Sequence, residues 1–304
     1  MLYSEITNQV FMDIYKIPQL LSISGHPVGF GGCRNDENHF DCCEYNITVF
    51  DERSGESIHE LSDQFVKLHH CSISESNAGV LKQIENLTIL HDDQWQLRML
   101  LAKIKEKNTM ISNSYTRSCL VDAGILANKA KEAINTKNLF ASIWIKCACY
   151  FLVDALFSIN SKRPSPTHML EIIRHLKKND VNEIFSLIHQ ILGIERASVT
   201  VLPRMLKSTM GFSDMVEGNG HSKIIKRKYD YLVENSLLTD CYFYLGYLNR
   251  NNIMKVKNQI HRNPEFIHIL RVALDIESDP LVIGGQANAL LQRINELVDE
   301  KNQK

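Results

Sequence analysis

The sequence predicts an α+β fold, with a small sheet-containing unit over residues 1–93 and an all-helical body over residues 94–304. Two observations lead to this division. Nearly all β-branched, alternating segments lie before residue 93, where they are interleaved with short helical patterns. After residue 94, apolar residues recur at helical spacing to the end of the sequence. A further boundary near residue 200 is left open.

The composition is that of a water-soluble protein that buries a core. Of the 304 residues, 44% are hydrophobic and 23% are charged. The net charge of −1 gives no global field that would attract nucleic acid or an anionic membrane. Eight scattered cysteines form no disulfide framework and indicate free, buried thiols in a reducing cytoplasm.

The first residues and the most apolar stretch of the sequence predict a cytoplasmic protein. Residues 1–7 have neither the basic region nor the apolar core of a secretory signal. The most apolar stretch, residues 139–158, contains Lys146 and Asp154, and charges are costly at membrane depth. We therefore expect a buried helix here and no membrane partner.

Apolar spacing and turn residues set the elements of the first unit. A helix is predicted over residues 4–17, ended by Pro18, and residues 31–39 are predicted as a turn and the start of a helix. Residues 51–56 are predicted as a turn and residues 76–86 as a short helix. The predicted strands are residues 27–30, 45–50, 65–73 and 87–90.

Helices account for most of the second unit. The predicted helices are 94–107, 114–134, 138–160, 166–176, 179–193, 220–237, 239–249, 252–260, 264–274 and 283–300. Proline and glycine mark the breaks between them. Residues 210–222 have the composition of a mobile loop.

The segment from residue 28 to residue 50 joins a glycine pair to a polar strand. Gly31 and Gly32 follow a short apolar run, and Glu44 and Asn46 lie two residues apart at the start of the next strand, which predicts that they share one face. Glycines let the backbone approach a phosphate, and carboxylate or amide oxygens can bind the accompanying cation.

This segment resembles the core of the nucleotidyltransferase superfamily, in which a Gly-Ser pair precedes Asp-x-Asp on a strand and a third carboxylate follows on a later strand. Gly31-Gly32 correspond to the Gly-Ser pair, Arg34 to a basic residue that often follows it, and Glu44-Tyr45-Asn46 to Asp-x-Asp. Two residues depart from the pattern: Gly32 replaces the serine, and Asn46 replaces a metal-binding carboxylate.

The resemblance implies a mixed-sheet head that transfers a nucleoside monophosphate from ATP or another NTP to an unknown acceptor. It implies that Gly31, Gly32 and Arg34 hold the triphosphate. Glu44 and Asn46, with Asp41, would be catalytic. Glu44, Asn46 and Asp92 would bind magnesium. With so few anionic ligands we expect a degraded site of weak metal affinity.

Two alternatives to this function remain at this stage. The first is a catalytically inactive nucleotide-sensing or protein-interaction module, in which the helical body provides a binding surface or a homo-oligomer interface. In that case Asp92 or Asp93 simply caps the helix that follows.

The second alternative is a ribonuclease. Arg163 and His168 have the Arg-x(4–6)-His spacing, and the helices around them resemble HEPN helical domains, some of which degrade RNA. The competing interpretation places Thr167 as a helix N-cap, His168 in the first turn and Arg163 in solvent. The basic residues 223–228 leave a nucleic-acid partner open, although a solvated helix face is the commoner explanation.

Overall fold

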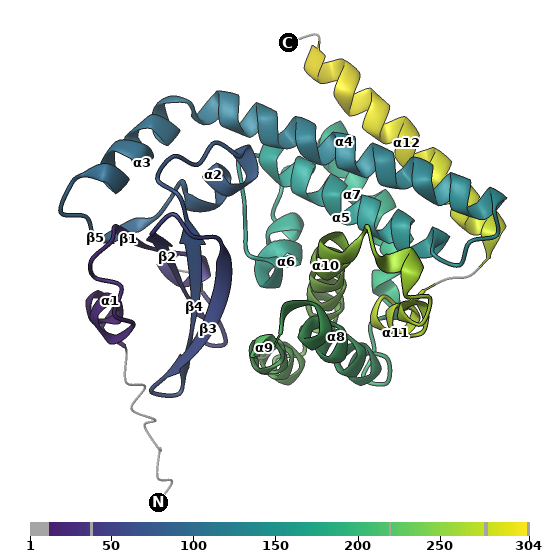
Figure 1. The fold of residues 1–304 in the computed structure, drawn as a ribbon. Helices are drawn as coiled ribbons and strands as arrows, with labels where there is room; N and C mark the ends of the chain where they lie inside the picture. The colour runs from purple at the N-terminus through teal and green to yellow at the C-terminus, as the bar shows by residue number, and fades with distance from the viewer. Residues whose placement is uncertain (1–11, 37–38, 219, 277–278, 303–304) are drawn as a thin grey trace, which may run out of the picture. The chain divides into compact units, whose positions relative to one another are not determined.

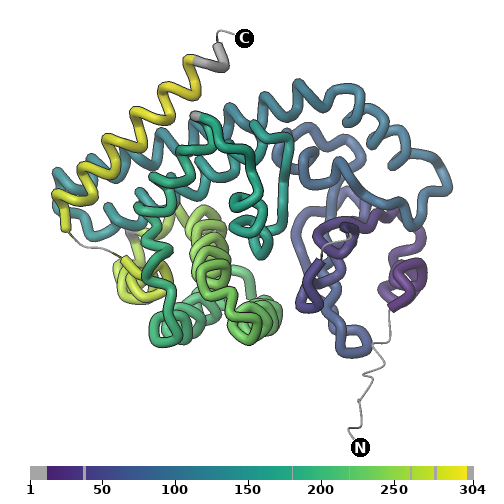
Figure 2. The backbone as a smooth tube through the Cα atoms, turned by 180° about the vertical axis from the view of Figure 1, so that it is seen from behind, coloured from purple at the N-terminus to yellow at the C-terminus, as the bar shows by residue number. Residues whose placement is uncertain are grey.

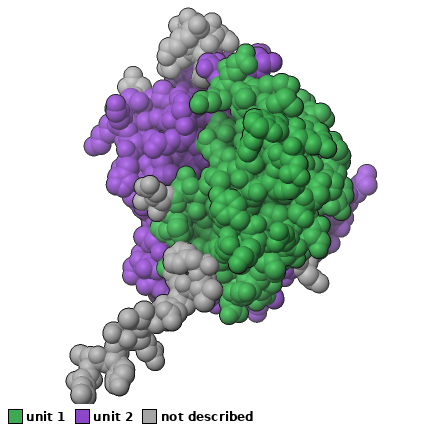
Figure 3. All heavy atoms as spheres, turned by 90° about the vertical axis from the view of Figure 1, so that its left-hand side faces the viewer, with its two compact units in different colours: residues 1–76, 84–106 green, residues 77–83, 107–304 purple. Residues whose placement is uncertain are grey.

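The structure is a computed structural model of the 304-residue chain, and it describes residues 12–36, 39–218, 220–276 and 279–302. Contacts divide the chain into two compact units (Figure 3). The sheet unit comprises residues 1–76 and 84–106, and the helical unit comprises residues 77–83 and 107–304. The predicted division at residue 93 falls just before a helix, residues 96–106, that clusters with the sheet.

The sheet unit contains a five-stranded mixed sheet with the strand order β3-β4-β2-β1-β5 (Figure 1). Its strands are β1 (Val28–Gly31), β2 (Tyr45–Phe50), β3 (Gly55–Leu61), β4 (Gln64–Cys71) and β5 (Thr88–His91). The pair β2 and β4 is parallel, and the other three pairs are antiparallel. The α+β class is thus confirmed.

Strand β3 was not predicted, and it overlaps only the last two residues of the turn predicted over residues 51–56. Gly55, Glu56 and Ser57 are turn-forming or polar residues, and β3 is an edge strand that pairs only with β4. Ser62 and Asp63 connect the two strands with positive φ angles of 47° and 63°. An edge strand needs few apolar residues because it buries little surface, so its composition resembles that of a loop.

The two faces of the sheet differ in character. One face carries the buried side chains of Val28, Phe30, Tyr45, Ile47, Val49, Val66 and Leu68, which pack with Ile17 and Ile23. Residues paired across strands lie on the same face, so the registers place Gly29, Gly31, Asn46, Thr48, Lys67, His69 and Glu56 together on the opposite face. All candidate site residues within strands therefore lie on this polar face.

The start of the chain differs from the predicted helix over residues 4–17. Residues 1–11 lie outside the described part, and after it come a 3-10 turn, Ile14–Lys16, and α1, Ile17–Leu20. Pro18 was predicted to end a helix but lies in the first turn of α1, where a missing N–H costs nothing. Of the predicted turn at 31–39, residues 33–35 form a 3-10 turn, and residues 37–38 are outside the described part.

The helices have close to the predicted positions over most of the chain. They are α2 (Ala78–Ile84), α3 (Gln96–Glu106), α4 (Asn108–Asn135), α5 (Ala141–Ile159), α6 (Met169–Arg174), α7 (Asp180–Leu192), α8 (Leu202–Glu217), α9 (His221–Glu234), α10 (Leu238–Val256), α11 (Phe266–Ala273) and α12 (Pro280–Asn302). In the helical unit α4 runs along α5, and α12 packs against α4 (Figures 1 and 2).

The predicted loop over residues 210–222 is wrong for most of its length. Helix α8 continues through Gly211 to Glu217. Gly211 is exposed, and Phe212 beside it is fully buried, so the burial of that side chain offsets the helix penalty of about 1 kcal/mol for a glycine. Similarly, the two helices predicted over 239–249 and 252–260 are one helix, α10.

Helix α5 is the central helix of the helical unit. It is long and apolar enough to cross a membrane, yet 89% of its apolar window is buried inside the protein. Its two charged residues, Lys146 and Asp154, are buried and have polar partners on other segments of the helical unit. These properties are those of a core helix, as the sequence predicted.

Candidate functional site

The glycine turn and the start of β2 lie side by side. Gly31 pairs with Asn46 in the antiparallel register of β1 and β2. Gly32 follows with φ of 74°, a left-handed conformation that favours glycine. A Cβ atom on Gly32 would overlap the amide nitrogen of Asn46 and lie 2.9 Å from its Cγ. The contact with Asn46 is therefore enough to require a glycine at position 32.

The other glycines of this strand accommodate a leucine. Cβ atoms added to Gly29 and Gly31 would lie 2.8 Å and 2.6 Å from the methyl carbons of Leu87. Leu87, which immediately precedes β5, thus packs over the backbone that was expected to approach a phosphate. Local sequence patterns could not predict this contact, because it joins segments more than fifty residues apart.

A hydrogen-bonded network covers the polar face from β2 to β3. His69 Nε2 lies 3.2 Å from Asn46 Oδ1, and His69 Nδ1 lies 3.0 Å from Glu56 Oε1. Lys67 Nζ lies 2.8 Å from Glu56 Oε2. The amide oxygen of Asn46, the atom expected to bind a metal ion, is thus already hydrogen-bonded to an imidazole.

Glu56 is the acid of this network. Burial raises its pKa, but the hydrogen bond from His69 and the charge of Lys67 outweigh burial and hold its pKa well below the usual range. Sequence reasoning missed Glu56 because it lies on the unpredicted strand β3. The alternation of Lys67 and His69 on β4 was the one available signal.

Arg34 holds the polypeptide between β1 and β2 in place. Its guanidinium donates to the carbonyl oxygens of Cys43 and, at 2.9 Å, of Asp41, and it lies 4.5 Å from the centre of the Tyr45 ring. A guanidinium with two carbonyl partners and a ring contact is positioned for loop structure. Its predicted role as a triphosphate ligand would require these contacts to break.

Glu44 and Asp41 lie before β2. Glu44 is a buried residue whose carbonyl oxygen is 3.4 Å from the amide nitrogen of Asn46. Asp41 is exposed and contributes its carbonyl oxygen to Arg34. Only Asn46 of the predicted catalytic residues lies in the strand itself.

Asp92 lies at the other end of β1. It follows His91, which pairs with Val28, whereas Asn46 pairs with Gly31. Three residue steps of about 3.3 Å and two strand spacings of about 4.8 Å therefore separate the two backbones. Asp92 Oδ2 accepts a hydrogen bond of 2.9 Å from the N–H of Arg98 in the first turn of α3. This is the helix-capping role that was the alternative.

These residues do not fit a magnesium ion. Oxygen ligands of one Mg²⁺ lie about 2.1 Å from the metal, so they lie within about 4 Å of one another. The strand register keeps Asp92 and Asn46 much farther apart than that, and His69 already hydrogen-bonds Asn46 Oδ1. The structure brings Gly32 and Asn46 together and does not bring Asp92 to them.

Arg163 and His168, the predicted ribonuclease pair, each contact other residues. The Arg163 guanidinium donates to the carbonyl oxygen of Gly79 and lies 4.9 Å from the Tyr115 ring centre. His168 is buried, with Nδ1 3.5 Å from Glu171 Oε2. Thr167 lies buried within the 3-10 turn that precedes α6, and His168 occupies the N-cap position that was assigned to Thr167.

The basic residues of α9 do not form one exposed cluster. Lys226 pairs with Asp230 at 2.5 Å, and Lys228 is buried with its ammonium 5.6 Å from the Tyr244 ring centre. A solvated helix face accounts for the exposed members. Of the basic residues in this run, Lys223 and Lys226 are exposed, Arg227 is half-buried and Lys228 is buried.

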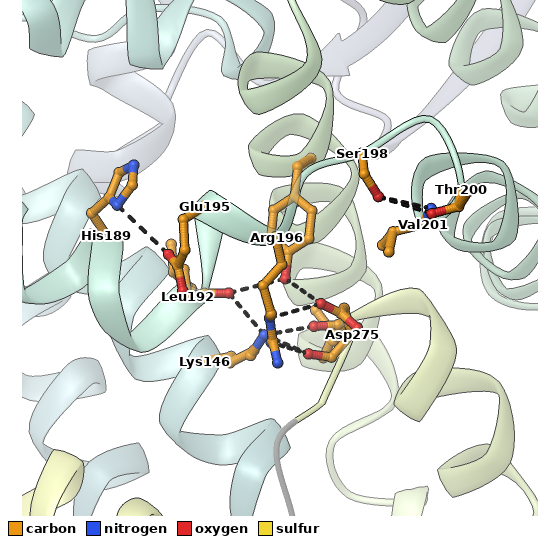
Figure 4. A network of polar contacts seen from close by, with 11 residues as sticks. Lys146, His189, Leu192, Glu195, Arg196, Ser198, Thr200, Val201 and Asp275 are labelled. Carbon is orange, nitrogen blue, oxygen red and sulfur yellow. Dashed lines mark hydrogen bonds and ion pairs between the residues drawn. The ribbon is translucent and has the colours of Figure 1, made fainter.

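A second polar network joins the C-terminal ends of two helices in the helical unit (Figure 4). Lys146 Nζ donates to the carbonyl oxygens of Leu192, Leu274 and Asp275 at 2.9, 2.7 and 3.0 Å. Arg196 Nε lies 3.0 Å from the Asp275 carboxylate, and the Tyr242 hydroxyl lies 3.1 Å from the same carboxylate. Lys146 thus satisfies carbonyl groups at the C-terminal ends of α7 and α11.

Fold and site together define an α+β protein with a mixed sheet, a polar sheet face and a separate helical unit. Neither a known protein family nor a curated protein sequence matches this chain. The assignment of function therefore rests on the geometry described above.

Proposed function

We propose that this protein is a catalytically inactive nucleotidyltransferase-like module that binds a nucleotide or a protein partner without transferring a nucleotidyl group. The observation that carries the proposal is the position of Asn46. Its side chain packs against Gly32 and accepts a hydrogen bond from His69, which in turn contacts Glu56.

In an active transferase, the residues at these positions would bind metal ions and the triphosphate. Two-metal nucleotidyl transfer depends on several carboxylates around the metal ions. Here the second strand position is an amide, Asp92 caps α3, and Leu87 packs over Gly31. The geometry therefore favours the inactive module over the Mg²⁺-dependent transferase, and it gives no support to the ribonuclease, since Arg163 is held by Gly79 and Tyr115.

Pyrophosphate release tests this proposal. Wild-type protein incubated with each NTP and Mg²⁺ is expected to release no pyrophosphate above the buffer background. Release that is present in the wild type and lost in Glu44→Ala would overturn the proposal in favour of the transferase. Isothermal titration with MgATP then separates a nucleotide sensor, which shows heat of binding, from a protein-interaction module, which shows none.

The cysteines support a reducing compartment such as the cytoplasm for this module. All eight cysteines lie in the described part of the chain, all are buried, and none forms a disulfide. Free buried thiols are typical of proteins that work where disulfides do not persist.

A further inference from the structure

A surface pocket in the helical unit lies between the start of α8 and the end of α11. It has a volume of about 370 Å³ and is lined by Val201, Arg204, His268, Arg271, Val272, Asp275 and Ile276. This volume is within the range of about 300 to 1,000 Å³ that is usual for small-molecule sites.

Basic groups outnumber acidic groups among the described residues that line this pocket. Arg204 and Arg271 contribute two guanidinium groups, and His268 contributes an imidazole. Asp275 is the only acid among the described lining residues, and its carboxylate is already paired with Arg196 at 3.0 Å and contacted by the Tyr242 hydroxyl (Figure 4). Arg204 also lies in the first turn of α8, where the helix dipole favours an anion.

An apolar pocket adjoins the cationic one. It has a volume of about 420 Å³ and is lined by Asn138, Leu139, Phe140, Pro264, Glu265, Ile267 and His268. His268 lines both pockets, so they meet at this residue. On α11, His268 and Arg271 are three residues apart and lie on one side of the helix, which directs both towards the cationic pocket.

The charge and shape of the paired pockets define what could occupy them. Two arginines recognise phosphate oxygens well because a guanidinium can donate two parallel hydrogen bonds. The neighbouring pocket offers Leu139, Phe140 and Ile267 to an apolar or aromatic group, and Glu265 at its rim disfavours a second anion there.

We propose that these two pockets form a binding site for a small phosphomonoester with an aromatic or apolar body, with Arg204 and Arg271 holding the phosphate. The site lies wholly within the helical unit. It is independent of the sheet residues discussed above, and its test does not depend on them.

Isothermal titration with phenyl phosphate, inorganic phosphate and phenol tests the site in the full-length protein. We expect phenyl phosphate to bind more tightly than either of the other two, because only it presents both a phosphate to the arginines and a ring to the apolar pocket. Arg204→Ala and Arg271→Ala should each weaken phenyl phosphate binding roughly tenfold, the loss expected for a charged hydrogen-bond partner.

Two further variants keep the result interpretable. Leu139→Ser should weaken phenyl phosphate binding and leave inorganic phosphate unchanged. Arg117→Ala, which removes an exposed arginine on α4, is the matched control and should change neither. Equal losses in Arg117→Ala and Arg204→Ala, or no binding of phenyl phosphate at millimolar concentration, would overturn the proposal.

Discussion

The contact between Gly32 and Asn46 brings the two candidate site residues together and also occupies the space between them. Gly32 has φ of 74°, and its Cα leaves no room for a Cβ beside the Asn46 amide. The sequence predicted that this glycine and this asparagine belong together. It could not predict that the contact is so close, since that depends on the register of β1 and β2.

A double-mutant cycle tests this contact. Gly32→Ala is expected to destabilise the protein by about 1–3 kcal/mol, since it adds both left-handed strain and overlap with Asn46. Asn46→Ala removes the acceptor of His69 and should cost about 1 kcal/mol. Alanine at 46 removes the overlapping Nδ2 and Cγ atoms and leaves only its Cβ, 3.0 Å from the added Cβ, so the double variant should be less destabilised than the sum of the two single variants.

Urea denaturation of the four proteins gives the coupling energy. Gly25→Ala is the control, because no atom lies within 4 Å of the added Cβ and the residue is exposed. Strictly additive effects of Gly32→Ala and Asn46→Ala would mean that the two residues do not touch in solution.

Titration of Lys146 is expected to make the free energy of unfolding depend on pH. Burial, followed by the charge of Arg196, lowers its pKa from 10.5 to about 7. Between pH 7 and 10.5 the unfolded chain therefore holds a proton that the folded protein has released. Since the unfolded state binds more protons in this window, the contribution of Lys146 to stability rises with pH.

Lys146→Met is expected to be less stable than wild type, because it leaves carbonyl groups at two helix ends without their donor. Its free energy of unfolding should also rise less between pH 7 and 9. The control is Lys207→Met, an exposed lysine on α8, which should follow the wild type. A wild-type slope in Lys146→Met would show that this lysine does not titrate in that range.

At the scale of elements, prediction succeeded where apolar periodicity was strong. Strand β2 has the predicted bounds, and α5 lies within the predicted helix, because both are nearly continuous apolar segments. Strand β3 and helix α8 were missed, because polar edge residues and an interior glycine mimic loops. Tertiary contacts decide such segments, and they are not visible in local spacing.

Two interior helix glycines are expected to respond oppositely to alanine. A Cβ on Gly246 of α10 would overlap the Tyr150 hydroxyl of α5, whereas nothing lies within 4 Å of a Cβ on Gly211 of α8. Gly246→Ala should destabilise the protein by about 1–3 kcal/mol through overpacking. Gly211→Ala should stabilise it by about 0.5–1 kcal/mol through helix propensity.

Thermal and urea unfolding of both variants measure these effects. Adding Tyr150→Phe, which removes the hydroxyl, should recover part of the loss in Gly246→Ala. A neutral Gly246→Ala would contradict the close packing of α5 against α10.

At the scale of the whole molecule, the burial of the cysteines predicts that their thiols react slowly with alkylating reagents. Burial raises the pKa of Cys147 and of Cys241 to about 12, so neither forms the reactive thiolate at neutral pH. With all eight cysteines buried, native protein should react slowly with iodoacetamide at pH 8, and denatured protein should take up eight groups. Intact mass spectrometry over time provides the count. Rapid labelling of several cysteines in native protein would contradict the packing described here.

The proposal of an inactive module makes its most direct prediction about the polar face of the sheet: Glu44 and Asn46 should not bind a metal ion there. Electron paramagnetic resonance of Mn²⁺ in the presence of ATP measures bound and free ion, and Mn²⁺ substitutes for Mg²⁺ because both prefer oxygen ligands. Wild type, Glu44→Ala and Asn46→Ala are predicted to leave the same amount of Mn²⁺ free. A bound fraction in the wild type that both variants lose would show that Glu44 and Asn46 hold a metal–nucleotide complex.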